Sequence, residues 1–120
     1  MKEGTGIRWG IFLDKQLIGT CGFNSYKPKG RSIIGYDINK EYWNKGYASE
    51  AIKAISNYGF LQLEIHRIEA YVTPGNIASE KVLKKCGFEK EGLLKHVSFF
   101  KGNYQDQILY AKINVAQQNA

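Results

Sequence analysis

The stretch from residue 41 to residue 52 contains the residues best suited to bind an anion. Its sequence, EYWNKGYASEAI, is typical of a strand that ends in a turn with one glycine and continues as a helix. No proline occurs between residues 44 and 49, so the backbone N–H groups at the helix start stay available to an anion. Gly46, Ala48 and Ser49 are small enough to let a phosphate approach the main chain, and Lys45 adds a positive charge. We therefore predict a pyrophosphate-binding turn, with an ordinary turn before a helix as the alternative.

A second stretch, residues 76–88, predicts another helix with a polar residue at its start. The sequence TPG at residues 73–75 ends the strand expected before it, and Asn76 is a favourable N-cap. Ala78, Val82 and Cys86 share one helix face, and Gly87 is placed to end the helix.

Together the two stretches resemble the GNAT (Gcn5-related N-acetyltransferase) family, in particular its Rim-like branch of ribosomal-protein-alanine-type acetyltransferases. The resemblance covers residues 8–116. It implies an α/β (α+β) acyl-CoA N-acyltransferase fold: a mixed, mostly antiparallel sheet with a central parallel pair and helices on its faces. In that fold the parallel strands splay apart and admit the pantetheine arm of the cofactor.

The resemblance also implies an activity, the direct transfer of an acetyl group from acetyl-CoA to a primary amine within a ternary complex. Coenzyme A is then a cosubstrate and no metal is required. The acceptor stays open between a protein N-terminus and a small molecule such as a polyamine, an antibiotic or an amino acid. A catalytically degenerate acyl-CoA-binding module is the alternative, and a nucleic-acid-binding domain, supported by charge alone, ranks last.

The family pattern assigns the cofactor contacts residue by residue. The backbone of six residues would hold the pyrophosphate: Asn44, Lys45, Gly46, Tyr47, Ala48 and Ser49. Main-chain N–H groups around Ile38 would polarise the thioester and pair with the pantetheine. Asn76 would contact the pantetheine arm. The residue is equally compatible with helix capping, and both roles can coexist. Trp43 departs from the pattern, because Gln or Arg is usual three residues before the glycine.

Acetyl transfer requires a base for the amine, stabilisation of the carbonyl oxygen and a proton for the leaving thiolate. Many family members protonate the thiolate with a tyrosine, but Leu83 stands at that position. We expect Ser79, one turn earlier, to replace it; a small residue tolerated against the cofactor is the alternative. Ile33 stands where many members have a glutamate base, so we carry Asp37 forward as the candidate base.

Other titratable residues have weaker contexts. His66 is expected to be structural, Glu69 and His96 stay open, and a solvent relay is an equally good base. Ser98 stands where some Rim-like members place a carboxylate. Asp106 matches the G-x-Y-x-D pattern of the branch, which we interpret as hairpin structure near the acceptor site.

The remaining pattern supplies the elements that must position these residues. Strands are expected at residues 8–13, 17–23, 32–38, 67–72, 88–100 and 104–115, and helices at about 48–60 and 76–86. Residues 101–103 are expected to form a hairpin turn. Gly35 predicts a bulge or a close backbone approach, or else a plain packing glycine. The strand-helix-strand order predicts a right-handed crossover to a parallel neighbour.

Composition sets limits on the class of protein. The 120 residues carry 17 Lys and Arg against 11 Asp and Glu, a net charge of +6, with lysines concentrated late at residues 81, 84, 85, 90 and 95. Such a basic face suits nucleic acid, a membrane surface, a polyanionic cofactor or only solvent. Two cysteines without metal-like spacing predict buried, reduced thiols. No apolar run reaches ~20 residues, so we expect a cytoplasmic protein without a membrane partner. The sequence contains neither a helix-turn-helix pattern nor a run of aromatic residues interleaved with basic ones, so we expect no nucleic-acid partner.

We expect one domain over residues 1–120, short at its N-terminus. The family normally begins with a further strand and two helices, which help to build the acceptor pocket. The chain is therefore either a fragment or a naturally short form. An uncovered apolar sheet face would not stay in water, and this predicts a homodimer or a higher homo-oligomer.

Overall fold

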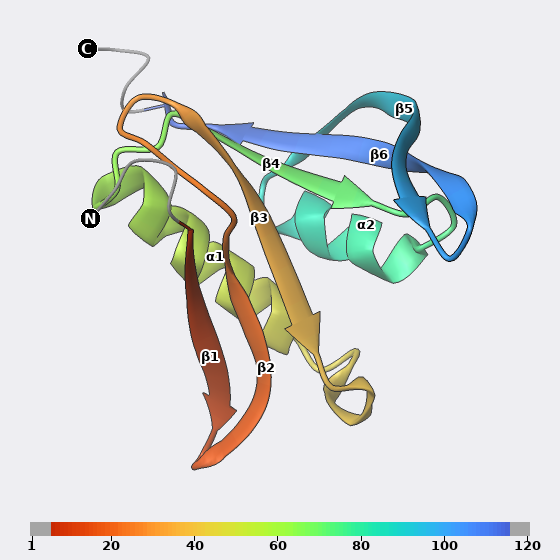
Figure 1. Ribbon diagram of the computed structural model, residues 1–120. Coiled ribbons are helices and arrows are strands. Elements are labelled where there is room, and N and C mark those ends of the chain that lie inside the picture. The colour runs from red at the N-terminus through yellow and green to blue at the C-terminus, as the bar shows by residue number, and fades with distance from the viewer. Residues whose placement is uncertain (1–5, 116–120) are drawn as a thin grey trace.

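The computed structural model describes residues 6–115, which form one six-stranded sheet and two α-helices (Figure 1). The strands are β1 (Ile7–Leu13), β2 (Gln16–Phe23), β3 (Arg31–Ile38), β4 (Arg67–Val72), β5 (Glu89–Phe100) and β6 (Asn103–Ile113). The helices are α1 (Tyr47–Leu61) and α2 (Ile77–Lys85), with a short 3-10 helix, η1 (Lys40–Tyr42), before α1. The predicted elements are thus confirmed within a few residues at their ends.

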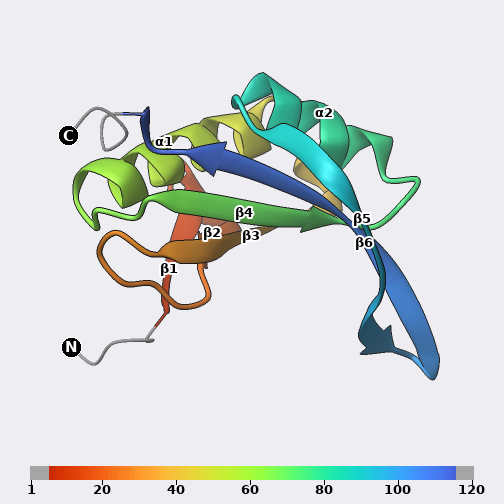
Figure 2. The same cartoon turned by 90° about the horizontal axis from the view of Figure 1, so that it is seen from above.

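The strand order is β1-β2-β3-β4-β6-β5, and β3 with β4 is the parallel pair. Helix α1 connects these two strands and α2 leads from β4 to β5, so both are crossover connections. Because both crossovers run in the same direction along the sheet, right-handed connections place both helices on one face. Figure 2 shows α1 and α2 together on that face, a more specific arrangement than the expected helices on the sheet's faces.

The core lies between this sheet face and the two helices. Its buried side chains include Cys21 and Ile34 from the sheet, Ile52 from α1, Leu83 from α2 and Cys86 directly after α2. Both cysteines are buried and free, as the sequence predicted. Burial raises the pKa of the Cys21 thiol to about 12 and also raises that of Cys86, so both thiols stay protonated at neutral pH.

The other sheet face, which the sequence analysis expected to be apolar, carries an ion-pair network. Arg31 and Arg67 lie opposite each other across the β3–β4 pair. The Glu69 carboxylate, with a side chain only 5% exposed, lies 2.9 Å from Arg67 Nε and 3.6 Å from Arg31 Nη1. Arg67 also donates two hydrogen bonds to Glu91 on β5. This ion-pair network makes the face polar at its centre, and the homodimer stays a prediction.

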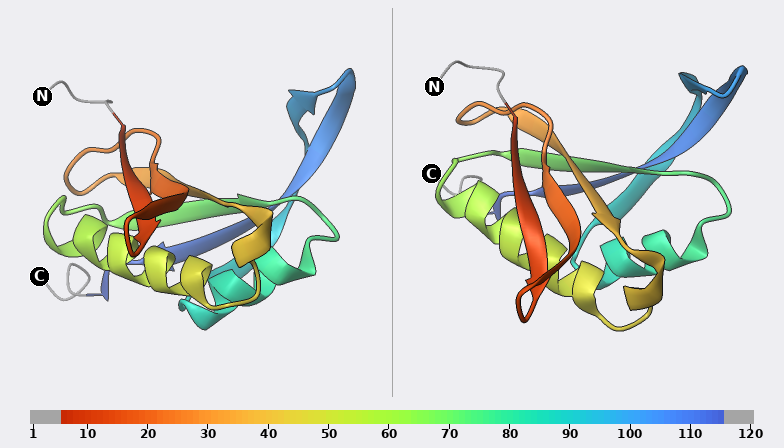
Figure 3. Two further views of the ribbon diagram at one scale, coloured as in Figure 1. Left: turned by 90° about the horizontal axis from the view of Figure 1, so that it is seen from below. Right: turned by 60° about the horizontal axis from the view of Figure 1, so that its bottom comes forward.

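Strands β5 and β6 form a hairpin that extends away from the rest of the sheet (Figure 3). Its turn has left-handed φ values of 52° at Lys101 and 81° at Gly102, while Asn103 already belongs to β6. The register shifts between Leu94 and Ser98, and there the His96 N–H donates to Asp106 Oδ1 at 2.9 Å. The hairpin role predicted for Asp106 is therefore confirmed.

None of the helices among residues 6–115 has the length and apolar character needed to cross a membrane.

Gly59, inside α1, provides a test of the helix-to-sheet packing. Alanine usually stabilises an exposed helix interior by about 1 kcal/mol relative to glycine. Here a Cβ would lie 2.7 Å from Phe23 Cζ and 3.3 Å from Ile65 Cδ1, and both of these neighbours are buried. We predict that Gly59→Ala lowers the free energy of unfolding by about 1 kcal/mol or more in urea titrations. Asn57→Ala, at an exposed position of the same helix, should leave it equal or higher.

Candidate cofactor cleft

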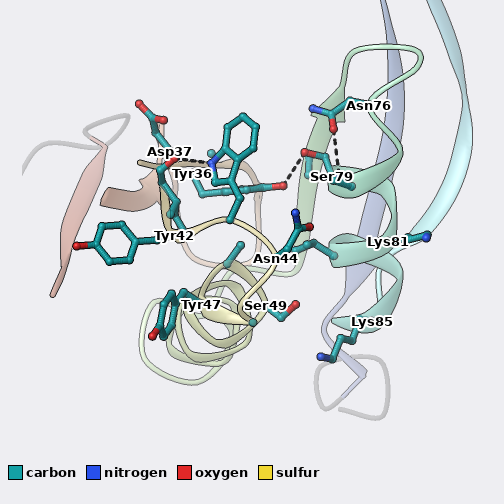
Figure 4. A pocket seen from close by; sticks show the side chains of 18 of the residues that line it. Tyr36, Asp37, Tyr42, Asn44, Tyr47, Ser49, Asn76, Ser79, Lys81 and Lys85 are labelled. Carbon is teal, nitrogen blue, oxygen red and sulfur yellow. Dashed lines mark hydrogen bonds between the residues drawn. The ribbon is translucent and has the colours of Figure 1, made fainter. Parts of the chain in front are cut away.

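A cleft of about 560 Å³ opens where β3 and β4 separate. The two strands pair only from Arg31 with Arg67 to Ile33 with Glu69, and beyond that point they diverge. The cleft is lined by the end of β3, the turn before α1 and the start of that helix, the end of β4, and one side of α2 (Figure 4). Of the nine residues predicted to bind the cofactor, eight line the cleft and Lys45 does not. Asp37, the candidate base, also lines it.

The turn before α1 leaves the start of the helix without a cap. Asn44 and Gly46 have left-handed φ values of 62° and 84°, and Gly46 is the N-cap with no side-chain hydrogen bond. The first bond inside the helix runs from the Glu50 N–H to the Gly46 carbonyl at 3.0 Å. The N–H groups of residues 47–49 therefore have no partner within the helix and carry its positive dipole end. An ideal Cβ on Gly46 would meet no atom within 4 Å, which leaves open space beside these groups.

Two lysines of α2 lie along the cleft near this helix start. Lys81 and Lys85 line the cleft from α2. Lys45 does not line it; its Nζ lies 6.0 Å from the centre of the Tyr42 ring, which does. Two of the lysines that the sequence analysis left unassigned thus line the cleft, although the Lys81 amine points away from it in Figure 4, and their charge favours a polyanionic ligand there.

The edge of β3 presents unpaired backbone groups to the cleft. The Asn39 N–H bonds to the Ile18 carbonyl on β2, at 2.8 Å. Backbone groups alternate along a strand, so those of Tyr36 and Ile38 point to the opposite edge, where β4 has already diverged. The Ile38 carbonyl accepts the Trp43 indole N–H at 2.7 Å. The pairing of β2 with β3 has no register shift at Gly35, so the bulge that was predicted as one alternative is wrong. A Cβ on Gly35 would meet no atom within 4 Å.

The α2 wall carries the hydroxyl and amide groups of the cleft. Asn76 Oδ1 accepts a hydrogen bond from the Ser79 N–H at 3.2 Å, which confirms the predicted cap. Ser79 Oγ accepts a hydrogen bond from the Tyr36 hydroxyl at 2.8 Å. Leu83, at the position of the family tyrosine, is 1% exposed and packs in the core, outside the cleft.

The candidate bases lie in different places. Asp37 is exposed at the cleft and, as Figure 4 shows, its carboxylate points away from Ser79. Glu69 is paired with two arginines on the helix-free face. The His66 backbone joins two loops through bonds to Gly30 and Asn114, and His96 stacks on Tyr104 in the β5–β6 hairpin. Among these candidates only Asp37 lines the cleft.

Sequence reasoning missed Tyr36 and the indole of Trp43 as cleft residues. The alternation in β3 contained a signal for Tyr36, because it shares its strand face with Ile34 and Ile38, which are buried under the helices. No comparable signal existed for Trp43, whose indole position follows from the turn geometry. Among residues 6–115, no group of three or more His, Cys, Asp or Glu is arranged to hold a metal ion.

Comparison with known proteins adds independent findings. The sequence model of the acetyltransferase (GNAT) domain matches residues 1–89. An uncharacterized N-acetyltransferase, p20, from Bacillus licheniformis is 42% identical over 112 residues, which are 91% of this chain and 63% of that protein. The [ribosomal protein uS5]-alanine N-acetyltransferase of Escherichia coli is 32% identical over 92% of this chain and 59% of its own length.

Solved structures agree with these matches. The Mycobacterium smegmatis RimJ structure, in complex with a CoA-disulfide, superposes with a TM-score of 0.86 at 29% identity, over 92% of this chain and 54% of that one. The chain therefore spans less than two thirds of the length of each of these three proteins.

Substitutions at Asn76 separate capping from ligand contact. We predict that Asn76→Ala lowers the free energy of unfolding by about 1 kcal/mol, because the Ser79 N–H loses its partner, while Asn76→Ser keeps the cap and the stability. If the Asn76 amide also contacts coenzyme A, both variants lose affinity in calorimetric titrations. Full affinity in Asn76→Ser would leave the residue with its capping role alone.

Proposed function

The chain belongs to the GNAT acetyltransferase family, and on that premise we propose that it binds acetyl-CoA in this cleft and transfers the acetyl group to a primary amine. The observation that carries the proposal is the convergence of an uncapped helix start and an unpaired strand edge on one cleft. The first suits a pyrophosphate and the second suits an amide-containing arm.

The residues of the cleft fit coenzyme A in three respects. The N–H groups of residues 47–49 would bind the pyrophosphate, with Lys81 and Lys85 close to its charge. The backbone of Tyr36 and Ile38 would form hydrogen bonds with the pantetheine arm, as a sheet edge does with an added strand. The open space at Gly35 and Gly46 gives the ligand access to the main chain at both places. When bound, acetyl-CoA supplies the activated acetyl group.

The chain's own residues would supply the rest of the chemistry. The N–H of Ile38 would stabilise the thioester oxygen as it gains charge, and Ser79 would give a proton to the leaving thiolate. Asp37, directly or through water, would accept the proton of the amine. Orientation in the cleft adds to these effects, and in favourable cases it is worth about 7–11 kcal/mol.

The acceptor is proposed as a protein N-terminus or a small-molecule amine. Relatives support both classes by name, since they include ribosomal-protein-alanine and ribosomal-protein-serine acetyltransferases and, among solved structures, a spermidine N-acetyltransferase chimera. We further propose that the protein acts in the cytoplasm as a homodimer or higher homo-oligomer, without nucleic-acid or membrane partners.

A second candidate is an acyl-CoA-binding module without turnover. Two observations favour it: Leu83 is buried in the core where the family acid would stand, and Ile33 replaces the family glutamate. Both candidates predict binding of coenzyme A, and only the first predicts acetyl transfer.

Coenzyme A binding has an intrinsic reporter in Trp43, one of two tryptophans in the chain and exposed at the cleft. We predict that coenzyme A changes the fluorescence of the protein and that Trp43→Phe removes the change. Trp9, which packs on Phe23 and Tyr58 away from the cleft, serves as the internal control.

Gly46→Ala tests the helix start directly. The added methyl group strains a left-handed residue and crowds the phosphate, so we predict at least tenfold weaker coenzyme A binding. Gly102→Ala introduces the same strain at φ 81°, also into open space, but in the β5–β6 turn. It should leave the affinity unchanged, and equal losses in both variants would point to general destabilisation instead.

Thiol release with an amine panel decides between the two candidate functions. The panel consists of peptides with N-terminal alanine or serine, and spermidine. We predict turnover with at least one member, and at least tenfold lower kcat in Asp37→Asn at unchanged affinity for coenzyme A. Binding without turnover would favour the second candidate. An unchanged kcat in Asp37→Asn would mean that solvent, and not Asp37, accepts the proton of the amine.

A further inference from the structure

One hydrogen bond crosses the cleft from the sheet to α2. Tyr36, on the unpaired edge of β3, reaches over to α2, and its hydroxyl donates to Ser79 Oγ at 2.8 Å. Both residues line the cleft and both are half-buried (Figure 4). The bond joins the two walls at the level where the backbone of Tyr36 and Ile38 faces the ligand space.

The direction of this bond determines what Ser79 can do. A serine hydroxyl has one proton to donate and can accept from a second group. While the phenol donates to Ser79 Oγ, the serine proton is not needed for that contact and remains available to the cleft. Burial raises the pKa of the Tyr36 phenol, which keeps it protonated and able to donate.

Several other phenols within residues 6–115 have different surroundings. Leu83 follows Ser79 by one helical turn on α2 and is buried in the core. Tyr110, another buried phenol, donates to Glu80 Oε1 on α2. Tyr42 and Tyr47 line the cleft near the start of α1 and lie 6.3 Å apart, ring centre to ring centre, on the far side from Ser79 in Figure 4.

We propose that Tyr36 is a positioning residue for Ser79. Its hydroxyl donates a hydrogen bond to Ser79 Oγ and so directs the serine proton toward the sulfur of coenzyme A. It then replaces that proton after the serine has donated it to sulfur. The inference rests on the proposed function of the cleft. It replaces a single acid on α2 with a hydroxyl pair formed by a strand and a helix.

The step balances as follows. The amine nitrogen forms a bond to the acetyl carbon, and the bond between that carbon and sulfur breaks with its electron pair on sulfur. Sulfur takes the proton of Ser79 Oγ, and Ser79 Oγ takes the proton of the Tyr36 hydroxyl. The proton lost by the amine returns to the Tyr36 oxygen through water. The products are the amide and the free thiol, and both hydroxyls regain their starting state.

The test uses coenzyme A itself and needs no knowledge of the acceptor. A hydroxyl that donates to sulfur stabilises the thiolate and lowers the thiol pKa of the bound molecule. We measure this pKa from the ultraviolet absorbance of the thiolate in the wild-type complex and in Tyr36→Phe, Ser79→Ala and the double variant. Trp43 fluorescence measures coenzyme A affinity in each protein. Tyr58→Phe, which removes a phenol on α1 outside the cleft, is the matched control.

We predict that Ser79→Ala raises the pKa of the bound thiol by about one unit, a tenfold change in the thiolate fraction. Tyr36→Phe should raise it in the same direction. The double variant should show no more than the Ser79→Ala effect, because Tyr36 acts through Ser79. With any panel amine that is turned over, Tyr36→Phe should lower kcat at least tenfold and leave the KM for acetyl-CoA unchanged.

A wild-type thiol pKa in Tyr36→Phe, or additive effects in the double variant, would overturn the inference while leaving the proposed function intact. Failure of coenzyme A to bind the wild-type protein would overturn both. A purely structural role for Tyr36 would instead weaken binding and lower stability without a selective change in the thiol pKa.

Discussion

The divergence of two parallel strands is the constraint on which the rest of this structure depends. Strand β3 continues to pair with β2 up to Ile38, while β4 pairs with β6, and the two strands share only three register pairs. Beyond Ile33, the backbone groups of β3 that point toward β4 have no strand partner there. The Ile38 carbonyl accepts the Trp43 indole N–H, and the others are left to solvent or a ligand. At the other end, Glu69 holds the arginines that face each other across the short parallel pair.

The connections convert this opening into a site. Because β3 and β4 are parallel and each leads into a helix, the N-termini of α1 and α2 both lie at the carboxyl edge of the sheet, where ligands commonly bind in α/β folds. The helix starts differ in use. The side chain of Asn76 caps the start of α2. The start of α1 has a left-handed glycine at the N-cap position and no side-chain cap, so its N–H groups stay available to an anion.

Much of this was readable in the sequence, because the signals were local. A glycine before an amphipathic stretch, an asparagine after TPG and the alternation of residues 67–72 each predicted an element that the structure contains. Contacts across the cleft were not readable, since they depend on how far the strands diverge. The bond from Tyr36 to Ser79 and the ion pair of Arg31 with Glu69 join separate segments, and the bond from the Trp43 indole to the Ile38 carbonyl follows from the path of the turn; only the fold defines these spacings.

The central claim is that free amides at the start of α1 bind a diphosphate. The most direct measurement is an amide chemical-shift map of the isotopically labelled protein during titration with coenzyme A. The account predicts the largest shifts at residues 46–49, followed by residues 36–38, with the β5–β6 turn unaffected. Shifts concentrated elsewhere, with residues 46–49 unchanged at saturation, would contradict it.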